Sequence, residues 1–167
     1  MKVCVILSIL LLFGFITVSI RRYGLLNSYS AFSTKWLRDV HLSNTDVWGV
    51  VTFIAAFLMV PPMITAGEGS GWQFLGFFCP VYLILVGLTP EWESKPLQRK
   101  LHCAFAITCA LLCFGWIVLV CHCWYVVLAP FLICLALAHR LNRFDALVFW
   151  GEMVMFTSAY LTLLIIL

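Results

Sequence analysis

Residues 47–66 read VWGVVTFIAAFLMVPPMITA, a stretch that contains no charged side chain. A helix rises ~1.5 Å per residue, so roughly 20 mostly apolar residues cross the ~30 Å hydrocarbon core of a bilayer. This stretch therefore predicts a membrane-spanning helix.

The composition of the whole chain agrees with this prediction. Of the 167 residues, 64% are apolar and 10% are charged, and the mean hydropathy is +1.08. A soluble domain has about 45–50% apolar and ~25% charged residues, and one of this size could not bury so much apolar surface. The composition excludes a soluble enzyme, a nucleic-acid-binding protein and a disordered chain.

Six stretches reach or approach the length of a span. They are residues 3–20, 47–66, 73–89, 101–121, 123–138 and 146–167. The third and fifth are short and contain Pro80 and Pro130, which a membrane helix tolerates when neighbouring groups satisfy the freed carbonyl. Little sequence remains outside these stretches. We therefore expect one all-α domain over residues 1–167, a polytopic integral membrane protein that forms a six-transmembrane-helix bundle.

The basic residues give the predicted orientation. Those in the loops are Arg21, Arg22, Lys35, Arg38, Lys95, Arg99, Lys100, Arg140 and Arg143. Six crossings place these nine of the ten basic residues on one side, which the positive-inside rule assigns to the cytoplasm. Both termini are then outside, in a plasma or inner membrane. The start of the chain also has the charge and apolar run of a signal peptide, but no small-residue cleavage site follows it, so we expect a retained span.

Residues 25–40 form an amphipathic pattern between the first two spans. On a helical wheel the apolar residues Leu25, Leu26, Tyr29, Phe32, Trp36, Leu37 and Val40 fall within an arc of about 140°. Lys35 and Arg38 lie on the polar face. This pattern predicts an interfacial helix on the cytoplasmic side, whose membrane contacts are Tyr29, Phe32, Lys35, Trp36, Leu37 and Arg38. The alternative for the serine-rich part, residues 27–34, is a hydroxyl-lined active-site loop.

Ionisable side chains inside a membrane are costly and usually functional. Glu152 lies well inside the last predicted span, and His102 begins the fourth. Small residues at helical spacing after His102 indicate a helix–helix contact face, so we expect His102 to point inward. The two side chains would then meet near the cytoplasmic leaflet, as a structural hydrogen bond or as a proton relay or polar substrate site. The alternative is that Glu152 snorkels to the membrane surface or pairs with Arg21, Arg22 or Lys100.

Metal and redox sites are less favoured by the sequence. His41, His102 and His139 are enough in number for a three-histidine zinc site, but no span holds a pair of histidines at helical spacing. Cys121 and Cys123 flank His122 without the Cys-x-x-Cys spacing of a disulfide oxidoreductase. We expect no cofactor.

Two functions from different classes fit these features. The favoured one is a non-enzymatic membrane protein with an accessory, regulatory or lipid-interacting role. The alternative is a small transporter or membrane-embedded enzyme that uses Glu152 and His102 in a cytoplasmic-facing cavity. The expected partners are the lipid bilayer and either another membrane protein or a second copy of the chain, and nucleic acid is excluded.

The predicted orientation can be tested with reporter fusions. A reporter fused after Trp72 is expected to report an outside location, and one fused after Lys100 a cytoplasmic location, because the basic loops stay inside. The opposite pattern would overturn the predicted topology.

Overall fold

The computed structural model describes residues 1–39, 47–89, 92–93 and 95–167. Of these described residues 83% are helical, and none lies in a strand. The predicted all-α class is therefore confirmed. Residues 41–46, which include His41, lie outside the described residues.

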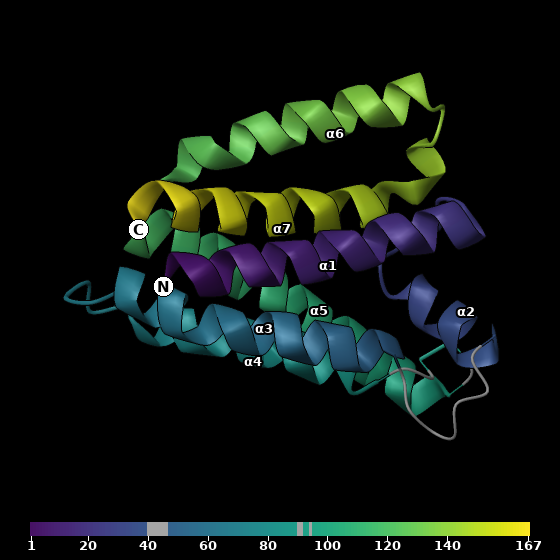
Figure 1. Ribbon diagram of the computed structural model, residues 1–167, viewed down its shortest axis with the longest axis horizontal. Coiled ribbons are helices and arrows are strands. Elements are labelled where there is room, and N and C mark those ends of the chain that lie inside the picture. Colours follow the sequence, from purple (N-terminus) through teal and green to yellow (C-terminus); the bar gives the residue numbers. More distant parts are fainter. Residues whose placement is uncertain (40–46, 90–91, 94) are drawn as a thin grey trace.

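Seven α-helices make up the described part of the chain. They are α1 (Lys2–Tyr23), α2 (Ala31–Asp39), α3 (Val47–Ala66), α4 (Phe74–Gly87), α5 (Pro96–Gly115), α6 (Leu128–Arg140) and α7 (Leu147–Ile166). A π-helical segment, Trp116–Val120, extends α5, and 3₁₀ turns at Trp124–Val127 and Phe144–Ala146 precede α6 and α7. The long helices run side by side, with both termini at one end of the molecule and α2 at the other (Figure 1).

Four of the described helices are long and apolar enough to cross a membrane. They are α1, α3, α5 with its π-helical extension, and α7 with the turn before it. The other two apolar helices are shorter, with 14 residues in α4 and 13 in α6. At ~1.5 Å per residue these helices measure only about 20 Å. Length and composition thus support several membrane helices.

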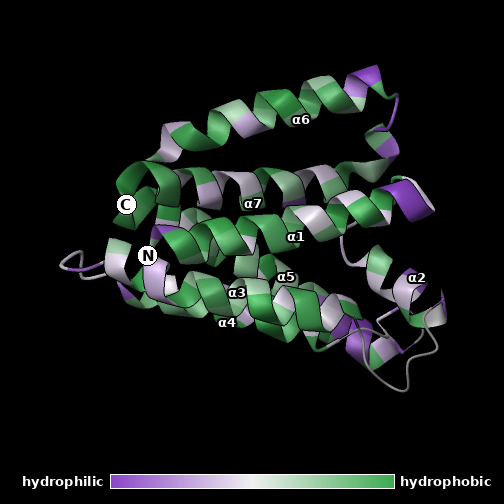
Figure 2. Cartoon of the chain, in the orientation of Figure 1, coloured by the Kyte–Doolittle hydropathy of each residue, from purple (hydrophilic) through white to green (hydrophobic). Residues whose placement is uncertain are grey.

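Polar residues gather at the ends of the helices, while the middle of the bundle is apolar (Figure 2). Arg21 and Arg22 lie in the last turn of α1, and His139 and Arg140 lie in the last turn of α6. These two helix ends lie at the end of the molecule where α2 is found (Figure 1). Basic residues that are far apart in the sequence therefore lie at one end of the bundle.

A buried serine joins three of the helices. Ser8 of α1 is fully buried, and its hydroxyl donates to the Ala55 carbonyl of α3 at 2.8 Å. The same oxygen lies 2.7 Å from the Tyr160 hydroxyl of α7. Because the Ser8 proton is used on Ala55, Tyr160 is the donor in the second bond. In a membrane, apolar side chains contact lipid as favourably as they contact another helix. Interhelical hydrogen bonds from small polar side chains therefore help to hold the helices together.

Helices α3 and α4 pack closely together at Gly76. A Cβ atom placed on Gly76 would lie 2.5 Å from the Met63 carbonyl oxygen, which is far closer than van der Waals contact. The same carbonyl accepts a hydrogen bond from the Trp116 indole N–H at 3.2 Å. A residue without a side chain is therefore required at position 76.

The segment predicted as an interfacial helix differs from expectation. Its helix begins at Ala31 rather than at residue 25. Tyr29 and Phe32 are 2% and 0% exposed, so protein surrounds both side chains, and they do not provide the predicted membrane contacts. The helical wheel failed here because an apolar face has the same pattern whether it meets lipid or protein.

The rest of α2 packs on the end of α1. The Trp36 indole N–H donates to the Ser19 hydroxyl at 2.8 Å, and Arg22 pairs with Asp39 at 3.3 Å. Lys35 is exposed and Leu37 is half-buried. The side chain of Arg38 and residue 40 lie outside what the structure describes.

The close contact at Gly76 leads to a stability prediction. Gly76→Ala should lower the free energy of unfolding in detergent by about 1–3 kcal/mol, because the new methyl group overpacks the Met63 backbone. The matched control is Gly151→Ala, where a Cβ meets nothing within 4 Å. That change should stabilise α7 by about 0.5–1 kcal/mol, since alanine is the better helix former. Equal thermal stability of the two variants would contradict the predicted overpacking.

Candidate functional site: an apolar cavity that ends at Glu152

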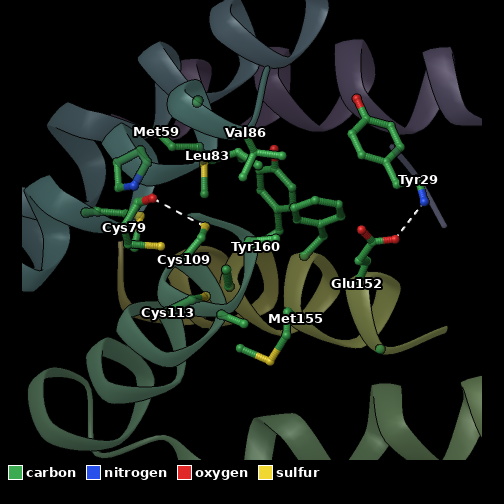
Figure 3. A pocket seen from close by; sticks show the side chains of 18 residues that line it. Tyr29, Met59, Cys79, Leu83, Val86, Cys109, Cys113, Glu152, Met155 and Tyr160 are labelled. Atoms are coloured by element: carbon green, nitrogen blue, oxygen red, sulfur yellow. Dashed lines mark hydrogen bonds between the residues drawn. The ribbon is translucent and has the colours of Figure 1, made fainter. Parts of the chain in front are cut away.

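A cavity of about 140 Å³ lies among α3, α4, α5, α7 and the α1–α2 loop. Methionine, cysteine, alanine and aromatic side chains form most of its wall, and Glu152 is its only acidic residue. Glu152 lies at one end and Cys79 and Cys109 at the other (Figure 3). An apolar cavity of ~150 Å³ in another protein holds benzene, so this volume suits a small ring or a short stretch of alkyl chain.

Glu152 makes one hydrogen bond with the protein. Its Oε2 atom accepts from the backbone N–H of Tyr29 at 2.6 Å (Figure 3). Within the described chain, the other oxygen, Oε1, has no hydrogen-bond partner, and no basic side chain pairs with the carboxyl. The site therefore has an unused acceptor.

The α1–α2 loop is held in place so that the Tyr29 N–H faces this carboxyl. Gly24 ends α1 with a φ of 76°, a left-handed conformation that favours glycine. The Asn27 carbonyl then accepts the backbone N–H of Phe149, in the first turn of α7, at 3.0 Å. The Tyr29 hydroxyl lies 3.0 Å from that of Thr52 on α3. Contacts with two helices thus position this backbone donor.

The serine-rich run has a structural role. The Ser28 hydroxyl accepts the N–H of Ala31 at the start of α2, and the Ser33 hydroxyl donates to the Ser30 carbonyl. Capping and turn bonds of this kind explain why serines gather before a helix. They supply no support for the alternative of a hydroxyl-lined active site.

His102 is buried, as its inward-facing stripe predicts, but its partner is not Glu152. Its Nδ1 lies 2.8 Å from the Thr89 hydroxyl, which itself donates to the Val86 carbonyl. Thr89 has one proton to give, so the Nδ1 of His102 carries a proton and donates to Thr89. The imidazole also stacks on Trp92, with ring centroids 5.0 Å apart.

The structure therefore does not bring the two predicted site residues together. Glu152 contacts the loop at Tyr29, and His102 contacts the residues that follow α4. Two ring contacts separate them, because Tyr29 packs on Trp48 at 5.5 Å and Trp48 packs on His102 at 6.4 Å. The expected Glu152–His102 pair is corrected to two separate polar contacts.

The cysteines and histidines do not combine into a metal site. Within the described ranges no cluster of three or more His, Cys, Asp or Glu side chains could hold a metal ion. Cys109 instead donates a weak hydrogen bond to the Cys79 carbonyl at 3.4 Å. In the turn before α6, burial raises the pKa of the Cys121 thiol to about 12. A thiol that stays protonated at neutral pH is a poor nucleophile.

Sequence reasoning missed two residues of the site. Tyr29 contributes a backbone N–H, which every residue except proline possesses, so no sequence signal identifies it. Tyr160 lines the cavity and hydrogen-bonds Ser8. A buried tyrosine hydroxyl usually needs a partner, and the serine within the first predicted span was the available signal.

A double-mutant cycle tests whether the two polar contacts are separate. Glu152→Gln and His102→Phe share no hydrogen-bond partner, so their effects on the free energy of unfolding should add within about 0.5 kcal/mol. His102→Phe with Thr89→Val removes both halves of one bond and should show a coupling of about 0.5–3 kcal/mol. Thermal unfolding in detergent gives these values. If Glu152→Gln couples more strongly to His102→Phe than Thr89→Val does, Glu152 and His102 are in direct contact and the prediction is wrong.

Comparison with known proteins gives no family for this chain. No protein-family model matches the sequence, and no match was found among curated proteins or solved structures. A function must therefore be inferred from the cavity, the Glu152 carboxyl group and the α1–α2 loop that contacts it.

Proposed function

We propose that this protein is a non-enzymatic, lipid-interacting membrane protein that binds a lipid-like molecule in the cavity beside Glu152. The observation that carries the proposal is an almost wholly apolar cavity with one carboxyl group in its wall. Ligand sites commonly combine an apolar lining with a few polar groups that fix orientation.

The surroundings of Glu152 support binding over catalysis. Nucleophilic catalysis typically needs a base within hydrogen-bond reach of the nucleophile. The partner of Glu152 is a backbone N–H, and His102 is engaged with Thr89. The alternative of a transporter or enzyme built on a Glu152–His102 pair thereby loses its geometric basis.

For the membrane arrangement we propose six spans, with α4 and α6 as the two short ones. Both termini lie at one end of the molecule, as an even number of crossings requires (Figure 1). The basic ends of α1 and α6 lie at the opposite end. By the positive-inside rule that end is cytoplasmic, with α2 at the cytoplasmic surface and the termini outside a plasma or inner membrane.

Photolabelling in vesicles tests binding in the cavity. An octanol probe with a diazirine at the end of its chain should label the wall residues Met155 and Leu83 in a saturable way. Excess unlabelled octanol should remove this labelling, whereas labelling of lipid-facing residues such as Leu132 should rise in proportion to probe concentration. Labelled residues are located by mass spectrometry of peptides.

A matched pair of variants provides the control. Ala110→Phe places a ring in the cavity wall and should abolish saturable labelling. Ala136→Phe makes the same change on the exposed surface of α6 and should leave labelling unchanged. Non-saturable labelling of every residue in the unmodified protein would refute the proposed function.

A further inference from the structure

We infer that the ligand of this cavity is a single-chain amphiphile with an ammonium head group, held by Oε1 of Glu152 and oriented with its chain toward Cys79 and Cys109. This inference rests on the proposed function, because it requires that the cavity holds a lipid-like molecule. It adds the chemical class of the head group and the direction of the chain.

The first argument is the unpaired oxygen of the carboxyl group. The Tyr29 N–H donates to Oε2 at 2.6 Å, and Oε1 has no hydrogen-bond partner among the described residues. An ionised carboxylate in apolar surroundings is costly unless a cation pairs with it. The described part of the chain offers no ion pair to Glu152. An ammonium head would supply both the missing positive charge and a donor for Oε1.

The second argument is the aromatic surface around the carboxyl. Tyr29 and Phe156 both line the cavity near Glu152, and their rings meet edge to face at a centroid distance of 5.6 Å. Phe156 lies one helical turn after Glu152 on the same face of α7. Aromatic rings attract cations electrostatically, and this is a common means of binding ammonium groups. A carboxylate beside two rings therefore favours an ammonium over a hydroxyl, and it repels a carboxylate head.

The third argument concerns the opposite end of the cavity. Its wall contains Cys79, Cys109, Leu83 and Met59 (Figure 3). The Cys109 thiol already has the Cys79 carbonyl as its partner. Thiol and thioether sulfurs behave as soft apolar groups that adapt to irregular shapes. This end can accommodate an alkyl chain but offers little to a polar head.

The access route follows from small residues on two helices. Gly151 of α7 is exposed, and Ala106 and Ala110 of α5 are partly exposed, while all three line the cavity. A Cβ at Gly151 would meet nothing within 4 Å, so there is open space beside α7 at this position. A chain can enter between α5 and α7 from the apolar outer surface of the bundle. The ligand therefore reaches the site from the bilayer.

Competition in phosphatidylcholine vesicles at neutral pH tests the head group. The competitors of the octanol photoprobe are octylamine, octanol and octanoate, each compared at equal membrane-bound concentration. Octylamine should compete about tenfold better than octanol, because hydrogen bonds to charged groups are stronger than neutral ones. Octanoate should be the weakest competitor. Octylamine with a diazirine at the end of its chain should label Leu83 and Cys109 rather than Gly151.

Glu152→Gln separates the charge from the hydrogen-bond acceptor. Glutamine keeps an oxygen for the Tyr29 N–H but loses the negative charge, so octylamine should lose its about tenfold advantage while octanol still competes. Glu68→Gln, an exposed acid in the loop before α4, is the control and should retain the advantage.

The outcomes distinguish the two proposals. Saturable octanol labelling without any preference for octylamine, or a preference that Glu152→Gln retains, overturns the ammonium assignment but leaves binding in the cavity intact. Absence of saturable labelling in the unmodified protein overturns the proposed function itself.

Discussion

The hydrogen bond from the Tyr29 N–H to Glu152 connects the irregular part of the chain to the helical bundle. In apolar surroundings a backbone N–H outside a helix must find a partner, because no water is available to take its place. Glu152 satisfies this donor from the second turn of α7 and thereby fixes the α1–α2 loop. The same bond leaves one carboxyl oxygen without a partner among the described residues, so a structural requirement also creates the polar end of the cavity.

Hydrophobic length predicted the helices well. Residues 47–66 match α3, and residues 146–167 differ from α7 by one residue at each end. Long apolar runs are reliable because the thickness of a bilayer sets their length. The α2 region was predicted less well, since its helix begins at Ala31 and Phe32 is enclosed by protein. An apolar face carries no information about whether its neighbour is a lipid or another helix.

The candidate site was only partly predictable. The sequence identified Glu152, because an acidic residue inside an apolar span stands out, and it identified His102 as inward-facing. It could not identify their partners. The carboxyl pairs with a backbone N–H 123 positions earlier in the chain, and the imidazole pairs with Thr89, which looks like an ordinary helix-end residue. The cavity arises from space that side chains of four helices and a loop leave unfilled, and no local pattern encodes such a space.

The contacts of Ser8 have a consequence for the biogenesis of the protein. Ser8 lies near the start of α1, but one of its partners, Tyr160, is 152 positions later on α7. During synthesis α1 leaves the ribosome long before α7. Until α7 has been made, the Ser8 hydroxyl can form a hydrogen bond only with α3. The Tyr29 N–H of the α1–α2 loop likewise lacks its Glu152 acceptor until α7 has been made. A chain that stops before α7 therefore lacks the acceptor of the Tyr29 N–H and the Tyr160 partner of Ser8, so the earlier helices depend on the last one for two of their buried polar contacts.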